Sequence, residues 1–254
     1  MQQLLSQKKI LLVGAGGLLG GKLVESLLAV DAQVIAADVK LEKLNEDLKK
    51  RGIDINTIEV REVDITNQFD VTNLFNVIGH IDGAINASYP RNSAYGAHLF
   101  DVSLESFNEN VSLQLGSAFL FSQQCAAYFK RQNHAFSLVN ISSIYGVITP
   151  KFQIYNDTLM TTPVEYAAIK SALLHLTKYI VAYVNDSRFR INCVSPGGIL
   201  DDQPDAFLEA YKKQTHGSGM LDSKDIVGSV LFFLSEYSQF ITGQNIIVDD
   251  GFSL

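Results

Sequence analysis

Short apolar runs alternate with longer segments of helical periodicity along almost the whole chain. The apolar runs predict strands at Ile10–Val13, Gln33–Ala36, Thr57–Arg61, Gly83–Asn86, Phe136–Asn140, Arg190–Val194 and Asn245–Val248. The intervening segments predict helices near Leu18–Ala29, Leu41–Arg51, Gln68–Ile78, Leu104–Lys130, Val164–Asn185 and Ser223–Ser235. This alternation is typical of βαβ units, whose strands pair in parallel. The sequence therefore predicts a doubly wound α/β fold, with a central parallel sheet of about seven strands and helices on both faces.

The chain shows no internal boundary. No Gly/Ser/Pro linker, block of like charges or repeat divides it, and strand signals continue almost to its end. Its 47% apolar and 19% charged residues are typical of a folded globular protein and not of a disordered one. We therefore expect residues 1–254 to form one domain, although the length alone would allow two.

Charge and hydropathy exclude two classes of partner. The formal net charge is −7 and no basic stripe is present, which argues against binding to nucleic acid. The longest weakly polar stretch, Ile10–Gly21, is short and interrupted by glycines, whereas a bilayer needs about 20 apolar residues. The first residues lack the pattern of a signal peptide. We expect a cytoplasmic protein with no membrane partner.

The cysteines and histidines predict no metal site. Cys125 and Cys193 lie in separate apolar runs, and neither belongs to a C-x-x-C pair. The five histidines do not show the spacing of metal ligands. Both cysteines are therefore interpreted as small buried side chains in a reducing compartment.

A glycine-rich turn, Gly14–Gly20, follows the first predicted strand and opens a helix. Such a turn lets a pyrophosphate approach bare backbone at the positive end of the helix. Asp38 ends the second strand 18 residues after Gly20, close to the spacing at which an acid binds an adenosine ribose. Its carboxylate would repel a 2′-phosphate, so NAD(H) is favoured over NADP(H), with Lys40 as the opposing feature.

Polar residues also follow the next two strands. Asp64 and Ile65 come after the third strand, and Asn86 and Ala87 end the fourth. The carboxyl ends of parallel strands form the ligand crevice of an open α/β sheet, so these residues are expected to converge there. The alternative is that Asp64 and Asn86 only stabilise turns.

The second half of the chain carries a candidate proton donor. Tyr166 and Lys170 are four residues apart, so a helix places them on one face, where the ammonium group would stabilise a phenolate. Ser143 follows the fifth strand and brings a hydroxyl to the same crevice. Asn110 is a polar residue in a long, mostly apolar helix. The alternatives are an amphipathic surface for Tyr166 and Lys170, and a cap or solvated face for Asn110.

Together these features resemble the short-chain dehydrogenase/reductase family, in family order and over essentially the whole chain. The matching motifs are Gly14-x-x-Gly17-x-x-Gly20, Asn86-Ala87, Asn110, Ser142-Ser143, Tyr166-x-x-x-Lys170, Ser195–Ile199 and Ile241–Asp249. The resemblance implies a Rossmann-type domain that uses NAD(H) to interconvert a secondary alcohol and a ketone. It also implies a homodimer or homotetramer, formed through the helices predicted at Leu104–Lys130 and Val164–Asn185.

The resemblance assigns roles to individual residues. Tyr166 would be the general acid/base, and Lys170 would lower its pKa and hold the nicotinamide ribose. Ser143 would polarise the substrate oxygen, and Asn110 would support a proton relay through water. The implied cofactor-binding residues are Gly14, Gly17, Leu18, Leu19, Gly20, Asp38, Asp64, Ile65, Asn86, Ala87, Tyr166, Lys170, Pro196, Gly197 and Ile199.

Two segments are expected to shape the substrate site. An insert at 149–163 lengthens the interval between Ser143 and Tyr166, and residues 200–220 resemble the substrate flap of the family. Ser143, Arg91 and Tyr155 are the predicted substrate contacts, and Arg91 with Lys151 would clamp a phosphate or carboxylate. The alternative for Arg91 is a solvated surface side chain.

The amino-acid sequences of several segments resemble those of the branch of the family associated with flagellin modification and nonulosonic-acid sugar synthesis. That resemblance implies a phosphorylated or nucleotide-linked sugar substrate. Two other hypotheses remain open: a dinucleotide-binding regulatory or partner protein with vestigial chemistry, and a sugar epimerase or dehydratase that recycles its NAD.

Overall fold

The computed structural model describes residues 3–132 and 134–254 and contains one parallel sheet of seven strands in those ranges. The strands are β1 (Lys9–Val13), β2 (Gln33–Asp38), β3 (Glu59–Glu62), β4 (Gly83–Asn86), β5 (Phe136–Ile141), β6 (Phe189–Pro196) and β7 (Asn245–Val248). Their order in the sheet is β3-β2-β1-β4-β5-β6-β7. The predicted doubly wound α/β fold is confirmed, and each predicted strand is present with ends shifted by at most two residues.

The strand order reverses beside β1. Both β2 and β4 pair with β1, so Val13 lies level with Ala37 on one side and with Asn86 on the other. The connections to β2 and to β4 therefore leave in opposite directions, which opens a crevice above the carboxyl ends of these strands. The register continues through Asn86, Asn140 and Cys193, so the carboxyl ends of β4, β5 and β6 lie close to the same edge.

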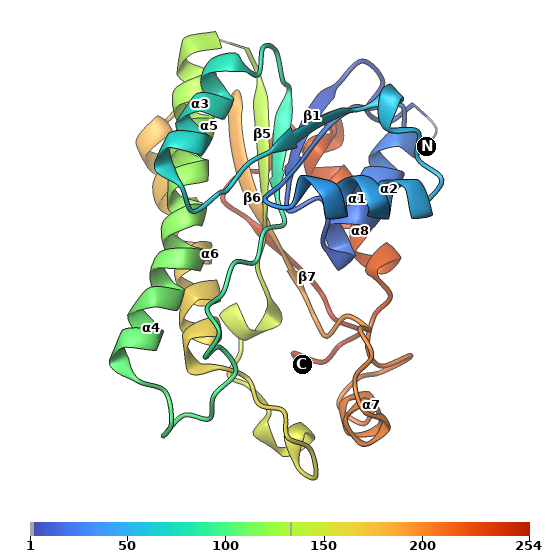
Figure 1. The fold of residues 1–254 in the computed structure, drawn as a ribbon, viewed down its shortest axis with the longest axis vertical. Coiled ribbons are helices and arrows are strands. Elements are labelled where there is room, and N and C mark those ends of the chain that lie inside the picture. Colours follow the sequence, from blue (N-terminus) through green and yellow to red (C-terminus); the bar gives the residue numbers. More distant parts are fainter. Residues whose placement is uncertain (1–2, 133) are drawn as a thin grey trace.

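Helices cover both faces of the sheet (Figure 1). They are α1 (Leu18–Ala29), α2 (Leu41–Lys50), α3 (Gln68–Val77), α4 (Leu104–Val111), α5 (Ser117–Gln132), α6 (Val164–Val184), α7 (Asp205–Lys212) and α8 (Ser223–Leu234). Figure 1 shows α1, α2 and α8 on one side of the sheet and α3, α5 and α6 on the other. The helix predicted near Leu104–Lys130 is present from Leu104 to Gln132, and a π-helical turn at Ser112–Gly116 divides it into α4 and α5.

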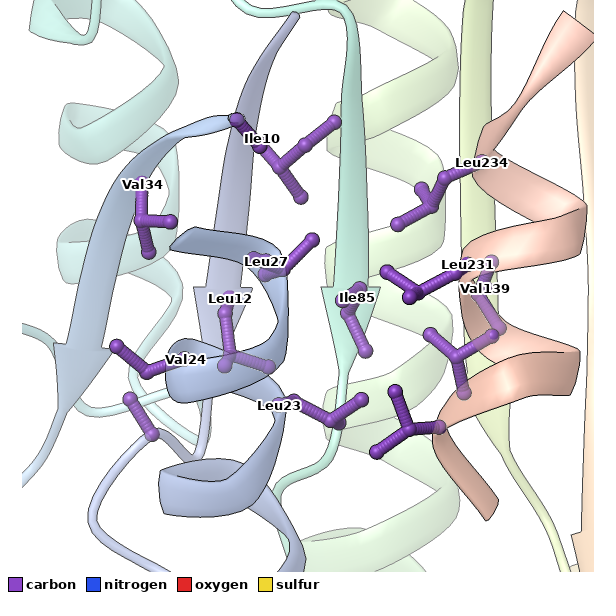
Figure 2. Close-up of a cluster of buried hydrophobic side chains, with 14 of the residues drawn as sticks. Ile10, Leu12, Leu23, Val24, Leu27, Val34, Ile85, Val139, Leu231 and Leu234 are labelled. Carbon is purple, nitrogen blue, oxygen red and sulfur yellow. The ribbon is translucent and has the colours of Figure 1, made fainter. Parts of the chain in front are cut away.

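Alternation along the strands builds two apolar layers. In β1, Ile10 and Leu12 face α1 and α8, while Leu11 and Val13 face the layer of α3 and α5. Figure 2 shows the first layer, in which Leu27 of α1 and Leu231 of α8 converge on the strands. Each fully buried aliphatic side chain of this kind contributes about 1.5–3 kcal/mol. These two layers fix the positions of the strand ends that surround the crevice.

A third, smaller apolar cluster lies beyond the carboxyl edge of the sheet. It joins the insert, the flap and the end of the chain through Ile144, Ile154, Phe207, Tyr211, Met220 and Phe252. The Tyr211 and Phe252 rings stack with centroids 4.4 Å apart. Figure 1 shows the C-terminus between α7 and the yellow segment of the insert. The segment 200–220, predicted as a flap, contains a helix, α7, that the periodicity did not predict, and Phe207 of this helix packs against Tyr155 of the insert.

Candidate active site

A cleft of about 1100 Å³ opens at the carboxyl edge of the sheet. This volume is slightly above the usual range of about 300–1000 Å³ for small-molecule sites. Most of the predicted site residues line it, namely Gly14, Gly17, Leu18, Leu19, Gly20, Asp38, Asp64, Ile65, Ala87, Arg91, Ser143, Tyr155, Tyr166, Lys170, Pro196, Gly197 and Ile199. Residues from distant parts of the chain thus meet in one cavity, as the strand register requires.

The glycine turn at the start of α1 is closely packed on one side and open on the other. Gly14 has a φ of +80°, and a Cβ there would lie 2.7 Å from the Ala87 carbonyl carbon. A Cβ on Gly20 would lie 2.0 Å from the Gly14 oxygen. By contrast, a Cβ on Gly17 would meet only that oxygen, at 3.4 Å. Gly14 and Gly20 therefore allow the turn to pack, while Gly17 leaves the side facing the cleft bare.

This cradle fits a diphosphate. The first N–H groups of α1 have no partner within the helix and carry its positive end. Among the described residues, no side chain caps this end, and the first turn holds no acidic residue. Leu18 and Leu19 of this turn line the cleft. The bare backbone and free donors thus match the expected pyrophosphate seat.

The two acidic residues that were predicted to bind the dinucleotide are both held by backbone N–H donors. Asp38 Oδ2 accepts from the Gly16 N–H at 2.9 Å, and its Oδ1 accepts from the Lys40 N–H at 3.2 Å. Asp64 Oδ1 accepts from the N–H and hydroxyl of Thr66 at 2.8 and 2.7 Å. Asp64 therefore stabilises a turn, as the alternative had it, and also lines the cleft. Both carboxylates keep free lone pairs for a ligand.

Tyr166, Ser143 and Lys170 meet where the cleft adjoins β5. Lys170 Nζ donates to the Ile141 carbonyl at 3.0 Å and lies 5.5 Å from the centre of the Tyr166 ring. Ser143 Oγ accepts from the Tyr145 N–H at 3.2 Å, which fixes the hydroxyl at the strand end. Phenol, hydroxyl and ammonium groups are thus gathered around one point of the cleft.

Burial controls the titration of this group. It raises the pKa of Tyr166, while the hydrogen bond with Ser143 acts in the lowering direction and Tyr155 adds a further increase. Burial also lowers the pKa of Lys170 to about 8. The net effect on Tyr166 in the absence of a ligand is a raised pKa, because desolvation of the phenol is the largest contribution. The role expected for Lys170 towards Tyr166 stays a prediction.

Two predicted site residues do not line the large cleft. Asn86 Oδ1 accepts from the N–H and hydroxyl of Ser88, at 3.2 and 2.7 Å, and so closes a turn after β4. Asn110 is fully buried, and its Nδ2 donates to Asn92 and to Glu165, both at 3.1 Å. Both N–H groups of the Asn110 amide are therefore used away from the catalytic group, which does not suit the proton relay expected for it.

Gln114 presents a buried amide of the kind that the relay expected for Asn110 would need. It lies in the π-helical turn, and with Asn86, Ser88 and Lys170 it lines a separate cavity of about 20 Å³, which is enough for one water molecule. Neither amide atom of Gln114 has a hydrogen-bond partner of ordinary geometry among the described residues. The amide contributes to lowering the pKa of Tyr95, against the larger increase that burial causes. A buried amide beside the Lys170 cavity suits a relay through water.

The substrate half of the cleft is aromatic and carries one exposed cation. The Tyr89 ring stands edge-on to Tyr166 with centroids 5.7 Å apart, and Arg91 Cζ lies 5.2 Å from the Tyr89 centroid. The Tyr155 hydroxyl hydrogen-bonds to that of Tyr145 at 3.1 Å. The expected partnership of Arg91 with Lys151 was wrong, because Lys151 Nζ donates to the Phe252 carbonyl at 2.7 Å and does not line the cleft.

Three expectations concern parts of the molecule outside the cleft: association between copies of the chain, membrane contact and metal binding. Phe119 of α5 and Tyr179 and Tyr183 of α6 are exposed, consistent with the predicted association through these helices, and the oligomeric state stays a prediction. None of the helices within residues 3–132 and 134–254 combines the length and apolar character needed to cross a membrane. In the same ranges, no three His, Cys, Asp or Glu side chains are placed to share a metal ion.

Comparison with known proteins places the chain in a family. The family model described as enoyl-(acyl carrier protein) reductase matches residues 15–253. Post-translational flagellin modification protein A of Campylobacter coli is 34% identical over 263 positions, which cover 99% of this chain and 100% of the relative. The chain belongs to the short-chain dehydrogenase/reductase family. As a member, it is an oxidoreductase that acts on a CH–OH group and binds a nicotinamide dinucleotide.

A solved structure and a second sequence relative agree with this placement. The short-chain dehydrogenase of Leptospira borgpetersenii serovar Hardjo-bovis, crystallised with bound NAD+, is 33% identical and has a TM-score of 0.85 over 98% of this chain and 94% of its own. The 7alpha-hydroxysteroid dehydrogenase of Bacteroides fragilis is 25% identical over 97% of this chain and 95% of its own. The resemblance seen in the motifs is thereby confirmed.

Proposed function

We propose that this enzyme uses NAD(H) to interconvert a secondary alcohol and a ketone on an anionic, sugar-derived substrate. The observation that carries the proposal is the meeting of Tyr166, Ser143 and Lys170 in one cleft, between a bare-backbone phosphate seat and the exposed cation Arg91. The name of the Campylobacter coli relative supports a flagellin-linked sugar, and the bound NAD+ of the Leptospira structure supports the choice of dinucleotide.

In the reducing direction, the Tyr166 hydroxyl gives its proton to the substrate oxygen. The raised pKa of Tyr166 keeps the phenol protonated before the reaction. The Ser143 hydroxyl donates a second hydrogen bond to the same oxygen and stabilises the charge that develops there. Lys170, in its charged form, stabilises the phenolate left behind. The dinucleotide, when bound, supplies or accepts the hydride.

The structure also suggests how the proton is replaced. Lys170 faces the small cavity that Gln114 lines, and a water molecule held there would connect the ammonium group with the Gln114 amide. We include this relay in the proposed mechanism, with Gln114 in the role that the sequence motifs gave to Asn110.

Asp38 is expected to set the choice of dinucleotide. Its carboxylate is anchored to Gly16 N–H at the edge of the cleft, where it would accept bonds from ribose hydroxyls and repel a 2′-phosphate. In Asp38→Ala, the ratio of NADPH to NADH dissociation constants should fall by about 10–100-fold, equivalent to about 1.4–2.8 kcal/mol. Titration of both dinucleotides against the two proteins measures it. An unchanged ratio would contradict the assignment.

Arg91 is expected to recognise the anionic part of the substrate. Dihydroxyacetone and its phosphate form a matched pair of probes that differ only by the anion. In Arg91→Gln, the KM for the phosphate should rise about tenfold, whereas kcat/KM for the neutral ketone stays within twofold, as expected for one lost charge-assisted contact. NADH consumption measures both. The matched control Lys43→Gln removes a cation from the dinucleotide half of the same cleft.

The same assay separates the remaining alternatives. Equal effects of Arg91→Gln on both probes would contradict an anionic substrate. Conversion of a nucleotide-linked sugar without net change in NADH would favour an epimerase or dehydratase. Tight NADH binding without turnover of any alcohol or ketone in a broad sugar and polyol panel would favour the partner protein with vestigial chemistry.

A further inference from the structure

The loop between β4 and α4 carries Arg91, and a reciprocal pair of amide hydrogen bonds fastens it. Asn110 Oδ1 accepts from the Asn92 N–H at 3.1 Å, and Asn92 Oδ1 accepts from Asn110 Nδ2, also at 3.1 Å. One bond holds the loop backbone and the other holds the Asn92 side chain. Together they fix the residue next to Arg91 against α4 in a single orientation.

Asn92 is also tied to the exposed side of α4 and to its own loop. Its Nδ2 donates to Ser106 Oγ at 3.1 Å and to Glu109 Oε2 at 2.6 Å. Its Oδ1 accepts a further bond from the Ala94 N–H at 3.2 Å. A half-buried loop asparagine with this many partners is an anchor for the segment and not a solvated turn residue.

The pair extends to the helix that carries the general acid. Asn110 Nδ2 donates to Glu165 Oε1 at 3.1 Å, and Glu165 directly precedes Tyr166 in α6. Asn110 and Glu165 are 0% and 1% exposed, so these bonds form away from competing water. The loop, α4 and the start of α6 are therefore joined through Asn110.

The anchored loop fixes two side chains relative to the general acid. The Tyr89 ring stands edge-on to the Tyr166 ring. The Tyr89 hydroxyl forms a hydrogen bond with the hydroxyl of Tyr95, which follows Asn92 in the sequence. Arg91 lies against the Tyr89 ring and lines the cleft. The position of the guanidinium group relative to the Tyr166 hydroxyl thus depends on where Asn92 is held.

We propose that Asn92, Asn110 and Glu165 form a positioning set that holds Arg91 over the cleft and so determines the affinity for the anionic end of the substrate. In this proposal Asn110 is a positioning residue and not a member of the proton relay. The proposal rests on the function proposed above, in which Arg91 binds that anion. The three residues of the set affect the affinity for the substrate, whereas the rate of proton transfer depends on Tyr166.

The test is Asn92→Ala in the full-length protein, which removes every hydrogen bond of the Asn92 side chain, keeps the bond from its backbone N–H to Asn110, and leaves the buried helices intact. The KM for dihydroxyacetone phosphate should rise about tenfold, kcat should stay within twofold, and kcat/KM for dihydroxyacetone should be unchanged. Amide hydrogen exchange in residues 88–96 should accelerate at least tenfold. Ser93→Ala, on the same loop and exposed, is the matched control. It should change neither the KM for dihydroxyacetone phosphate nor the rate of hydrogen exchange.

A double variant checks that the bonds matter and not the side chain as such. Asn92→Asp places a carboxylate beside Glu109 and should also raise the KM for dihydroxyacetone phosphate. In the double variant Asn92→Asp with Glu109→Gln, the amide at position 109 can donate to the carboxylate at position 92, so most of the affinity should be recovered. A fall in kcat with unchanged KM in Asn92→Ala would overturn the proposal, because it would place the set in proton transfer.

Failure of this proposal is distinguishable from failure of the proposed function. If Arg91→Gln affects both probes equally, the anionic substrate is wrong. If Arg91→Gln discriminates between the probes but Asn92→Ala neither raises the KM nor accelerates exchange, the positioning set alone is wrong. If the wild-type protein turns over neither probe, unchanged hydrogen exchange in Asn92→Ala still overturns the set.

Discussion

Tyr166→Phe is expected to lower turnover about 1000-fold while the dissociation constant for NADH changes by less than twofold. General acid/base catalysis contributes about 10²–10⁴-fold, and the substitution removes only the phenolic oxygen that carries the proton. The ring and its edge-on contact with Tyr89 remain, so the shape of the cleft is kept. Steady-state reduction of the two probe ketones and a fluorescence titration with NADH measure the two quantities.

The matched control for this variant is Tyr145→Phe. Tyr145 also lines the cleft, but its hydroxyl bonds Tyr155 and belongs to the insert side of the site. It should lose less than tenfold in kcat. Comparable losses in the two variants would show that the cleft needs its phenols for shape, and full activity of Tyr166→Phe would remove Tyr166 from the chemistry.

Lys170→Met is expected to abolish turnover and to make the protein more stable. Burial lowers the pKa of Lys170 from 10.5 to about 8, so below pH 8 the folded protein carries a charge that burial disfavours by about 3 kcal/mol. Losing the hydrogen bond to the Ile141 carbonyl offsets about 1–2 kcal/mol of that gain. The expected net gain of about 1–2 kcal/mol corresponds to a Tm increase of about 3–6 °C.

The pH dependence of this gain identifies its cause. The folded pKa lies below the unfolded one, so the cost of burying Lys170 is fully present below pH 8 and disappears as the pH rises towards 10.5. Thermal unfolding of the dinucleotide-free proteins between pH 6.5 and 10 would follow it. The exposed Lys43→Met is the control and should show no such trend. A gain of equal size at every pH would assign the effect to packing.

The sheet and most of the cleft could be predicted because they depend on local pattern. The continuous apolar run Ile10–Val13 marks the first strand, and the glycine turn and Asp38 follow at fixed distances along the chain. In a parallel sheet the carboxyl ends of strands lie at one edge, so motifs that are far apart in sequence must meet there. The ends of the strands shifted by one or two residues because pairing with a neighbour continues past the apolar run, as in Asp38 with Glu62.

The buried amide beside Lys170 could not be identified from the local sequence pattern. Asn110 and Gln114 are four residues apart, and both are buried polar side chains in one apolar helical pattern, so an ideal helix would place them on one face. In the structure a π-helical turn at Ser112–Gly116 follows Asn110, and the two side chains meet different partners: Asn110 binds Asn92 and Glu165, whereas Gln114 lines the cavity beside Lys170. The flanking leucines, Leu113 and Leu115, were the available signal that Gln114 is a buried amide in an apolar setting.

The third apolar cluster could not be predicted from the sequence either. Its members Ile154, Phe207 and Phe252 are each separated by tens of residues, and only the path of the chain over the carboxyl edge brings them together. Lys151 illustrates the difficulty: a cation beside the active site in sequence was expected to bind substrate, but it binds the Phe252 carbonyl instead.

That cluster makes the segment after β7 a structural support for α7 and for the insert beside the cleft. Phe252 stacks on Tyr211 of the flap helix, and the Tyr211 hydroxyl in turn accepts from the Gly198 N–H at 2.6 Å. An engineer who grafts a foreign insert onto this scaffold to change its specificity must therefore redesign the flap and the final residues in the same step.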